Sequence, residues 1–108
     1  QAVRFVTNVK LTRSSGFHHS FDFVVGESQR RPERYLRAIN TPNRDNIVEM
    51  MFAWQDLRDV RPRNALAYAV LNDQERKLSR PLLDGLDRYQ IGVIPWRDRE
   101  NKLASLRE

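Results

Sequence analysis

The chain contains no cysteine, and it has only four glycines and two methionines among its 108 residues. The lack of cysteine excludes disulfide bonds and thiolate metal sites, and with them the class of small secreted domains that disulfides hold together. No apolar run is long enough to cross a bilayer, and the N-terminal segment QAVRFVTNVK lacks the basic and apolar regions of a signal peptide. We therefore expect a cytoplasmic protein without membrane contact.

Acidic residues are scarce in one part of the chain. Residues 1–44 hold eight basic and three acidic residues, whereas residues 45–108 hold eleven of each, so the net charge of +5 comes from the first part. Sixteen of the nineteen basic residues are arginine, whose forked guanidinium binds phosphate or carboxylate through paired hydrogen bonds. This asymmetry favours a polyanionic partner, and a solvated basic surface without a partner is the alternative.

Length and composition predict one domain over residues 1–108. The hydrophobic share of 40% and the charged share of 31% are typical of a globular domain. At the N-terminus, apolar residues alternate with polar ones over residues 3–12 and again over residues 17–25, which indicates two strands. The segment Ser14-Ser15-Gly16 between them suits a short hairpin loop with glycine in the left-handed conformation.

This hairpin loop fixes a register in which the numbers of paired residues sum to about 30. Asp22 then lies opposite Asn8, with Lys10 on the diagonal. The period of two predicts that one face of the second strand carries Phe17, His19, Phe21, Phe23 and Val25, and that the other face carries His18, Ser20, Asp22 and Val24.

The middle of the chain predicts helices. Tyr35, Leu36 and Ile39 have helical spacing, so we predict a helix that begins at Pro32-Glu33 with proline in its first turn, and a strand over residues 34–40 is the second interpretation. Another helix is expected over residues 45–60, because its apolar residues recur at the spacing of one helix face. This stripe, which must be buried, consists of Ile47, Met50, Met51, Trp54 and Leu57.

The second half predicts a βαβ unit. Residues 65–71 and 91–94 are continuous apolar runs, as in strands that are covered on both faces. A helix between them begins near Ser79, with Pro81 in its first turn. Because such crossovers are right-handed, the two strands should be parallel. The expected fold class is therefore α/β, with a mixed sheet built from the hairpin and the βαβ unit in the order ββααβαβ.

Five blocks of sequence, SGFHHSFDFVV, PERYLRAINTPNRD, FAWQDLRDVRP, YAVLND and IGVIPWRDRE, follow one another over about residues 14–100. This pattern resembles the bacterial family called domain of unknown function 1829. The resemblance implies a C-terminal module of a longer protein or a stand-alone relative, and it supplies no activity. Recurring positions of the family pattern, whose roles it leaves open, match Trp54, Asp56, Arg61, Pro62, Asn72, Asp73 and Trp96.

The order of elements also raises the hypothesis of a restriction-endonuclease-like fold, on a weak topological likeness. Such nucleases place an acidic residue on the second strand and an acidic-x-lysine pair on the third, because carboxylates hold a divalent ion and the lysine steadies the attacking water. Asp22 fits the first position. If residues 34–40 form the third strand, the other two positions fall near Ala38 and Asn40, which cannot perform this chemistry. We therefore expect no metal ion, no cofactor and no catalysis.

A hydrolase or metal site has only two weak candidates, His18 and Asp22. Two ligands on one strand are too few, and no motif such as HExxH supplies a third. The preferred interpretation is structural, with Asp22 paired to Lys10 or Arg4. His19, on the opposite face, is expected to find a partner in the core.

The sequence thus predicts a nucleic-acid-associated module that is not an enzyme, of the degenerate nuclease-like kind linked to mobile elements or defence. Its partner would be nucleic acid or a nucleic-acid-processing protein. The predicted polyanion-binding residues are Arg30, Arg31, Arg34 and Arg37, with the last two on one exposed helix face. The alternative is a protein-interaction or inhibitory module without nucleic-acid contact, for which Trp96 is a candidate contact residue.

Overall fold

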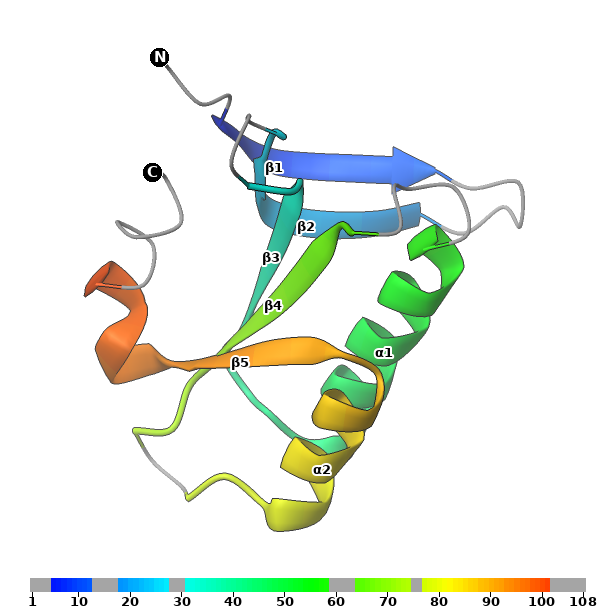
Figure 1. Cartoon of the computed structure of the whole chain (residues 1–108). Helices are drawn as coiled ribbons and strands as arrows, with labels where there is room; N and C mark the ends of the chain where they lie inside the picture. The colour runs from blue at the N-terminus through cyan, green and yellow to red at the C-terminus, as the bar shows by residue number, and fades with distance from the viewer. Residues whose placement is uncertain (1–4, 13–17, 28–30, 59–63, 75–76, 102–108) are drawn as a thin grey trace.

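Five strands and two helices form the described part of the chain in a computed structural model (Figure 1). The structure describes residues 5–12, 18–27, 31–58, 64–74 and 77–101. The strands are β1 (Phe5–Thr12), β2 (His18–Val25), β3 (Arg34–Ile39), β4 (Leu66–Leu71) and β5 (Ile91–Pro95). The helices are α1 (Arg44–Arg58) and α2 (Arg80–Arg88), and a single 3-10 turn, η1 (Trp96–Asp98), follows β5.

The strands lie in one mixed sheet in the order β1-β2-β3-β4-β5. β1 to β3 are antiparallel neighbours, whereas β3, β4 and β5 run parallel to one another. α1 and α2 connect the parallel strands and lie on the same side of the sheet (Figure 1). The α/β class, the mixed sheet and the parallel pairing of β4 with β5 are confirmed. Neither helix of the described ranges is long and apolar enough to cross a membrane.

The predicted order ββααβαβ is wrong at one element, because residues 34–39 form strand β3 and not a helix. β3 is a central strand between β2 and β4. Tyr35 and Ile39 pack against the helices, and Leu36 packs into a second cluster on the other face. A strand that is buried on both faces does not alternate between apolar and polar residues. The apolar residues of β3 therefore had a spacing that also fits a helix.

The hairpin register is confirmed by the pairs Phe5↔Val25 and Val9↔Phe21, whose numbers sum to 30. The loop at residues 14–16 lies outside the described residues. The predicted faces hold only for part of β2. Phe21 joins the helix-side core, whereas Phe23 and Val25 belong to the second cluster, so the inward side changes at Asp22. This change falls next to the end of the β2–β3 ladder at Phe23↔Leu36.

The main core lies between the sheet and the helices. Four residues of the predicted α1 stripe are buried and Met51 is partly buried against them, and the ring of Trp54 lies 5.6 Å from that of Tyr35 on β3. Asn43 caps α1, since its side-chain oxygen accepts the Asn46 N–H at 2.9 Å. The helices approach closely at Gly85, where a β-carbon would lie 2.5 Å from Met51 Cε. α2 begins as predicted, with Ser79 at its N-cap and proline in its first turn.

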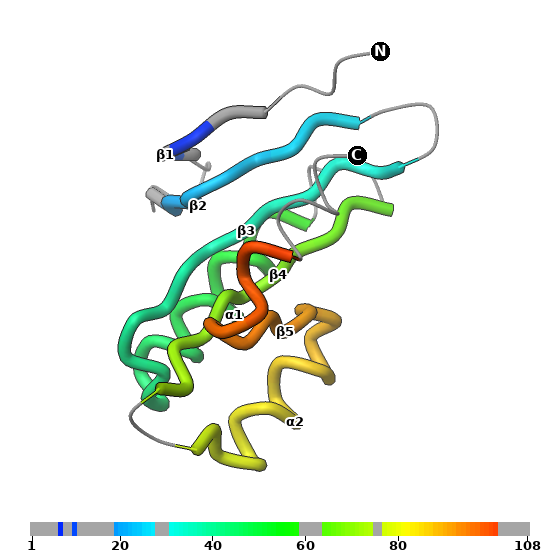
Figure 2. The backbone as a smooth tube through the Cα atoms, turned by 90° about the vertical axis from the view of Figure 1, so that its left-hand side faces the viewer, coloured from blue at the N-terminus to red at the C-terminus, as the bar shows by residue number. Residues whose placement is uncertain are grey.

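The face of the sheet away from the helices carries a second, smaller cluster. Figure 2 looks onto this face, with η1 in front of β4 and β5. Its buried members are Val25, Leu36, Val70 and Ile94, and the partly buried Phe23, Tyr68 and Trp96 pack against them. Both faces of the parallel strands are therefore covered, as expected from their continuous apolar sequences.

Candidate functional site

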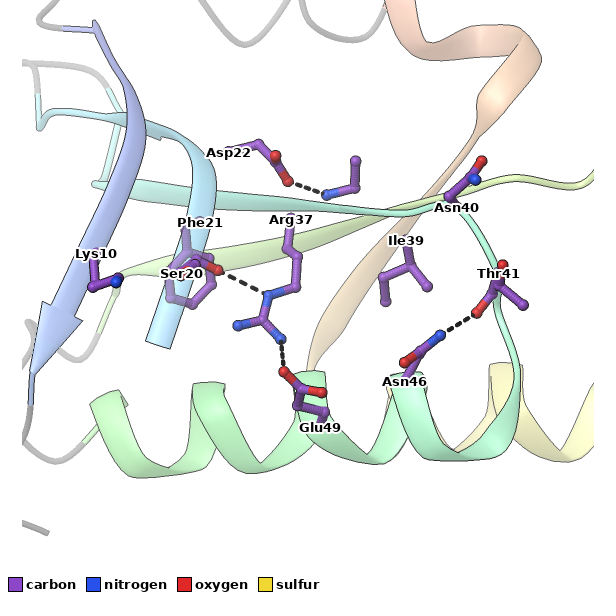
Figure 3. Close-up of a pocket in the computed structure, with 11 residues that line it drawn as sticks. Lys10, Ser20, Phe21, Asp22, Arg37, Ile39, Asn40, Thr41, Asn46 and Glu49 are labelled. Atoms are coloured by element: carbon purple, nitrogen blue, oxygen red, sulfur yellow. Dashed lines mark hydrogen bonds and ion pairs between the residues drawn. The ribbon is translucent and has the colours of Figure 1, made fainter. Parts of the chain in front are cut away.

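A cleft opens where β2 and β3 separate. The ladder between these strands contains three pairs and ends at Phe23↔Leu36, although β2 stays paired with β1 as far as Thr12↔His18. The resulting space has a volume of about 600 Å³, and α1 lies along one side of it (Figure 3). This volume is in the range of roughly 300–1,000 Å³ that is typical of ligand sites. The polar residues that line it are Lys10, Ser20, Asp22, Arg37, Asn40, Thr41, Asn46 and Glu49.

Two side chains replace the sheet hydrogen bonds that the separating strands lose. Asp22 Oδ2 accepts the backbone N–H of Ala38 at 2.6 Å, and Arg37 Nε donates to the backbone oxygen of Ser20 at 2.9 Å. Backbone groups that leave a ladder need new partners, and these two bonds supply them across the gap. Asp22 and Arg37 are therefore held in defined positions on either side of the cleft.

Arg37 is a largely enclosed cation of the cleft. Its side chain is 13% exposed, its Nη1 lies 3.6 Å from Glu49 Oε1, and its guanidinium lies 5.4 Å from the centre of the Phe21 ring. Burial lowers the pKa of Arg37, and the carboxylates of Glu49 and Asp22 oppose this change. An arginine nevertheless stays protonated at neutral pH. The guanidinium is thus a permanent cation between two carboxylates (Figure 3).

Amide and hydroxyl groups line the part of the cleft at the carboxyl end of β3. Asn46 Nδ2 donates to the backbone oxygen of Thr41 at 2.7 Å, and Asn72 Nδ2 donates to Asn40 Oδ1 at 3.0 Å. In α/β sheets, ligands bind at the carboxyl ends of parallel strands. The cleft therefore combines this location with neutral hydrogen-bonding groups and with the cations of Lys10 and Arg37.

The cleft does not offer a metal site in its described residues. No three histidine, aspartate or glutamate side chains gather closely enough there, or elsewhere in the described ranges, to hold an ion. Asp22 is directed at Ala38 and Glu49 at Arg37, so the two carboxylates do not converge (Figure 3). The arrangement can bind a polar ligand through its cationic, amide and hydroxyl groups.

Comparison with known proteins identifies the family. The family Domain of unknown function DUF1829 matches residues 14–99. The chain belongs to this family. A search of curated proteins finds no match. Among solved structures, the crystal structure of protein VC1899 from Vibrio cholerae has a TM-score of 0.65 and 16% identity, over 94% of this chain and 26% of that chain. At this identity the likeness shows the fold alone, and the DUF1829 chain spans about a quarter of the other protein.

Two of the predicted polyanion-binding arginines, Arg34 and Arg37, lie on opposite faces of the sheet in the DUF1829 domain. Arg37 lies in the cleft, whereas Arg34 is only 1% exposed and points to the other face of the sheet. The predicted exposed helix face is wrong, because residues three apart on a strand have opposite orientations. Arg31 is half-buried, and Arg30 lies outside the described residues.

Of the weak catalytic candidates, Asp22 lies in the cleft, and the side chain of His18 lies outside the described residues. Asp22 Oδ2 accepts the Ala38 N–H, and Lys10, one of its two expected partners, lines the same cleft, whereas Arg4 lies outside the described residues. Sequence reasoning missed Glu49 and Asn46. Both are polar residues of α1 outside its apolar stripe.

His19 has the core partner that the sequence predicted. Its Nε2 lies 2.7 Å from Asp56 Oδ2 on α1, and its ring packs edge-on against Phe52 at 5.5 Å. His19 is 4% exposed, so the pair is largely shielded from water. Asp56, a recurring position of the DUF1829 pattern, thus joins the outer part of β2 to α1.

Asp56→Ala is expected to lower the free energy of unfolding by about 1.5–3 kcal/mol, because it leaves the buried imidazole without its partner. Urea denaturation would measure this loss. The control is Gln55→Ala, an exposed neighbour on α1, which should change stability by less than about 0.5 kcal/mol. Equal, small effects of the two substitutions would mean that the pair contributes nothing to the fold.

Other family positions lie at the carboxyl ends of β4 and β5. The Asn72 backbone N–H donates to the Ile39 oxygen at 3.1 Å, which extends the pairing of β3 and β4 by one residue. Asp73 Oδ2 lies 3.6 Å from Arg97 Nε, and the Arg99 guanidinium lies 4.1 Å from the centre of the Trp96 ring. These contacts fix the chain as it leaves the sheet. The matched positions 61 and 62 lie outside the described residues.

Proposed function

We propose that this DUF1829 domain is a nucleic-acid-associated module without catalytic activity, built on a degenerate restriction-endonuclease-like frame. The contact between Asp22 and Ala38 carries the proposal. A nuclease of this class needs a carboxylate on the third strand, next to the one on the second strand. The 2.6 Å bond from the Ala38 N–H to Asp22 Oδ2 brings position 38 next to the carboxylate of β2.

The residues at the two remaining catalytic positions support a binding role. Alanine at position 38 offers no oxygen to an ion, and asparagine at position 40 lacks the charge of the lysine that steadies a water molecule. One carboxylate oxygen of Asp22 instead accepts a hydrogen bond from the backbone N–H of Ala38. The Arg37 guanidinium, 3.6 Å from Glu49 Oε1, offsets part of the negative charge of Glu49 and Asp22.

The cleft and the charge distribution support nucleic acid as the ligand. Lys10 and Arg37 line the cleft together with the amides of Asn40 and Asn46. Guanidinium, ammonium and amide donors are the groups that contact phosphate oxygens. The whole net charge of +5 resides in residues 1–44, which include β1, β2 and β3. In this proposal the domain acts in the cytoplasm, either on nucleic acid directly or beside a protein that processes it.

Fluorescence anisotropy with labelled single-stranded and duplex oligonucleotides tests the proposed function. Binding by the wild-type chain should weaken steeply with salt, because phosphate contacts release counterions. The double substitution Lys10→Gln and Arg37→Gln should weaken binding for all sequences and lower the salt slope by about one unit for each lost phosphate contact.

The matched control is Lys77→Gln with Arg88→Gln, which removes the same charge from exposed residues that do not line the cleft. This variant should retain wild-type affinity to within about three-fold, since it keeps both cleft cations. An equal loss in the two double variants would place binding outside the cleft. Undetectable binding by the wild-type chain at low salt would overturn the proposal in favour of a protein-interaction module.

A further inference from the structure

The guanidinium of Arg34 is enclosed, yet none of the residues that the structure describes bonds to it. The residue is 1% exposed, and its Nε, Nη1 and Nη2 all lack a hydrogen-bond partner there. Burial lowers the pKa of Arg34, as does the like charge of Arg31, and Tyr68 opposes them. A buried charge without a counter-ion is strongly unfavourable, so this geometry calls for an anion from elsewhere.

The adjacent carboxylate is committed to another contact. Glu33 Oε1 accepts a hydrogen bond from Tyr35 Oη at 2.6 Å. Tyr35 belongs to the core beneath the helices, whereas Arg34 faces the opposite side of the sheet, where its ladder neighbours two positions along are Leu36 and Tyr68. Glu33 is thus oriented by the helix-side core and not by Arg34.

Apolar residues surround Arg34 on this face. Leu66 lies directly opposite Arg34 in the β3–β4 ladder and is 39% exposed. Tyr68 follows two residues later, and its ring packs over Gly92, where a β-carbon would lie only 2.6 Å from Tyr68 Cδ1. Arginine and tyrosine are enriched at the centre of protein interfaces, and the exposed Leu66 adds apolar surface beside them.

We propose that Arg34, Leu66 and Tyr68 form a docking site for a protein segment that presents one aspartate or glutamate flanked by apolar residues, and that this segment displaces the groups that cover the guanidinium. The carboxylate would pair with the guanidinium in the two-pronged geometry that arginine favours. Phosphate groups of nucleic acid fit less well, since they stay hydrated, whereas the apolar flanks of a peptide can cover this face. In VC1899 the matched part is 26% of the chain, so a domain with this fold can have other parts of its own chain as neighbours.

This docking site lies on the face of the sheet away from the helices and is independent of the cleft. Its test uses the peptide acetyl-Leu-Glu-Leu-amide, its glutamine counterpart and a single-stranded oligonucleotide as probes. Each probe is titrated into the labelled chain up to the millimolar range, and the Arg34 Nε–H resonance is followed by nuclear magnetic resonance. The glutamate peptide should shift this resonance saturably, and the other two probes should not.

Arg34→Lys keeps the charge but loses the two-pronged guanidinium. It should lower the affinity for the glutamate peptide at least about ten-fold, which is the effect of one lost charged hydrogen bond. Arg34→Met should abolish its binding and should leave the urea midpoint equal or higher, because it removes an uncompensated buried charge. Identical responses to both peptides would overturn the proposal, as would a response to the oligonucleotide alone. A large fall of the urea midpoint in Arg34→Met would also overturn it, since Arg34 would then have an internal partner.

Discussion

Replacing Trp54 by alanine is expected to lower the free energy of unfolding by about 3–5 kcal/mol, the usual cost of deleting a large buried aromatic side chain. Trp54 is 2% exposed and packs against Tyr35, so its indole joins α1 to the central strand of the sheet. The loss would leave a cavity between these elements that a packed core cannot close. Chemical denaturation, followed by circular dichroism so that the signal does not depend on tryptophan, would measure it.

Trp96→Ala provides the control, because it removes the same side chain from a partly buried position after β5. Its cost should be less than half that of Trp54→Ala, since less apolar surface returns to water. A loss below about 1 kcal/mol for Trp54→Ala would contradict the packing of α1 on β3, because a residue in such a core cannot be that dispensable.

Ala38→Glu combined with Asn40→Lys is expected to create divalent-metal binding that the wild-type chain lacks. The new carboxylate would stand beside Asp22, whose Oδ2 already reaches the Ala38 N–H, and positions 38 and 40 are both exposed. Thermal unfolding with and without Mn²⁺ would reveal the site. At a hundred times the dissociation constant the ion should stabilise the variant by about 2.7 kcal/mol, while the wild-type melting temperature stays unchanged.

Adding Asp22→Asn to the double variant supplies the matched control. The amide is close in shape to the carboxylate and can still accept the Ala38 N–H, but it removes one charged ligand. We expect the affinity for Mn²⁺ to fall at least about ten-fold, because the triple variant has one charged ligand fewer. A response that survives in this triple variant, or one that is already present in the wild-type chain, would show that Asp22 and position 38 do not form the site.

Elements with one buried face could be predicted from the sequence, because their apolar period is unambiguous. α1 was found from the stripe that ends at Leu57, and the hairpin register followed from its short loop. β3 was not predicted as a strand, because Tyr35 and Leu36 are buried on opposite faces and their spacing fits a helix equally well. With β3 misread, the parallel pairing of β3 with β4 was also missed.

The cleft could be predicted only in part, for the same reason. Asp22 was identified, as were the positions 38 and 40 that a third strand would place beside it. The role of Arg37 could not be found, because its contact with Ser20 exists only where two strands separate. Glu49 reaches the cleft from the next helix, and the pairing of His19 with Asp56 spans 37 residues. Contacts of this kind depend on the tertiary structure and leave no periodic signal.

Nuclear magnetic resonance of the wild-type chain, titrated with an oligonucleotide in the presence of Mg²⁺, tests the proposed function most directly. The Ala38 amide and the Arg37 Nε–H are internal reporters, because both bridge the separating strands. We expect both resonances to shift on binding while the oligonucleotide stays intact. Cleavage of the oligonucleotide by the wild-type chain, or binding that leaves both resonances unmoved, would contradict a nucleic-acid-binding cleft without catalytic activity.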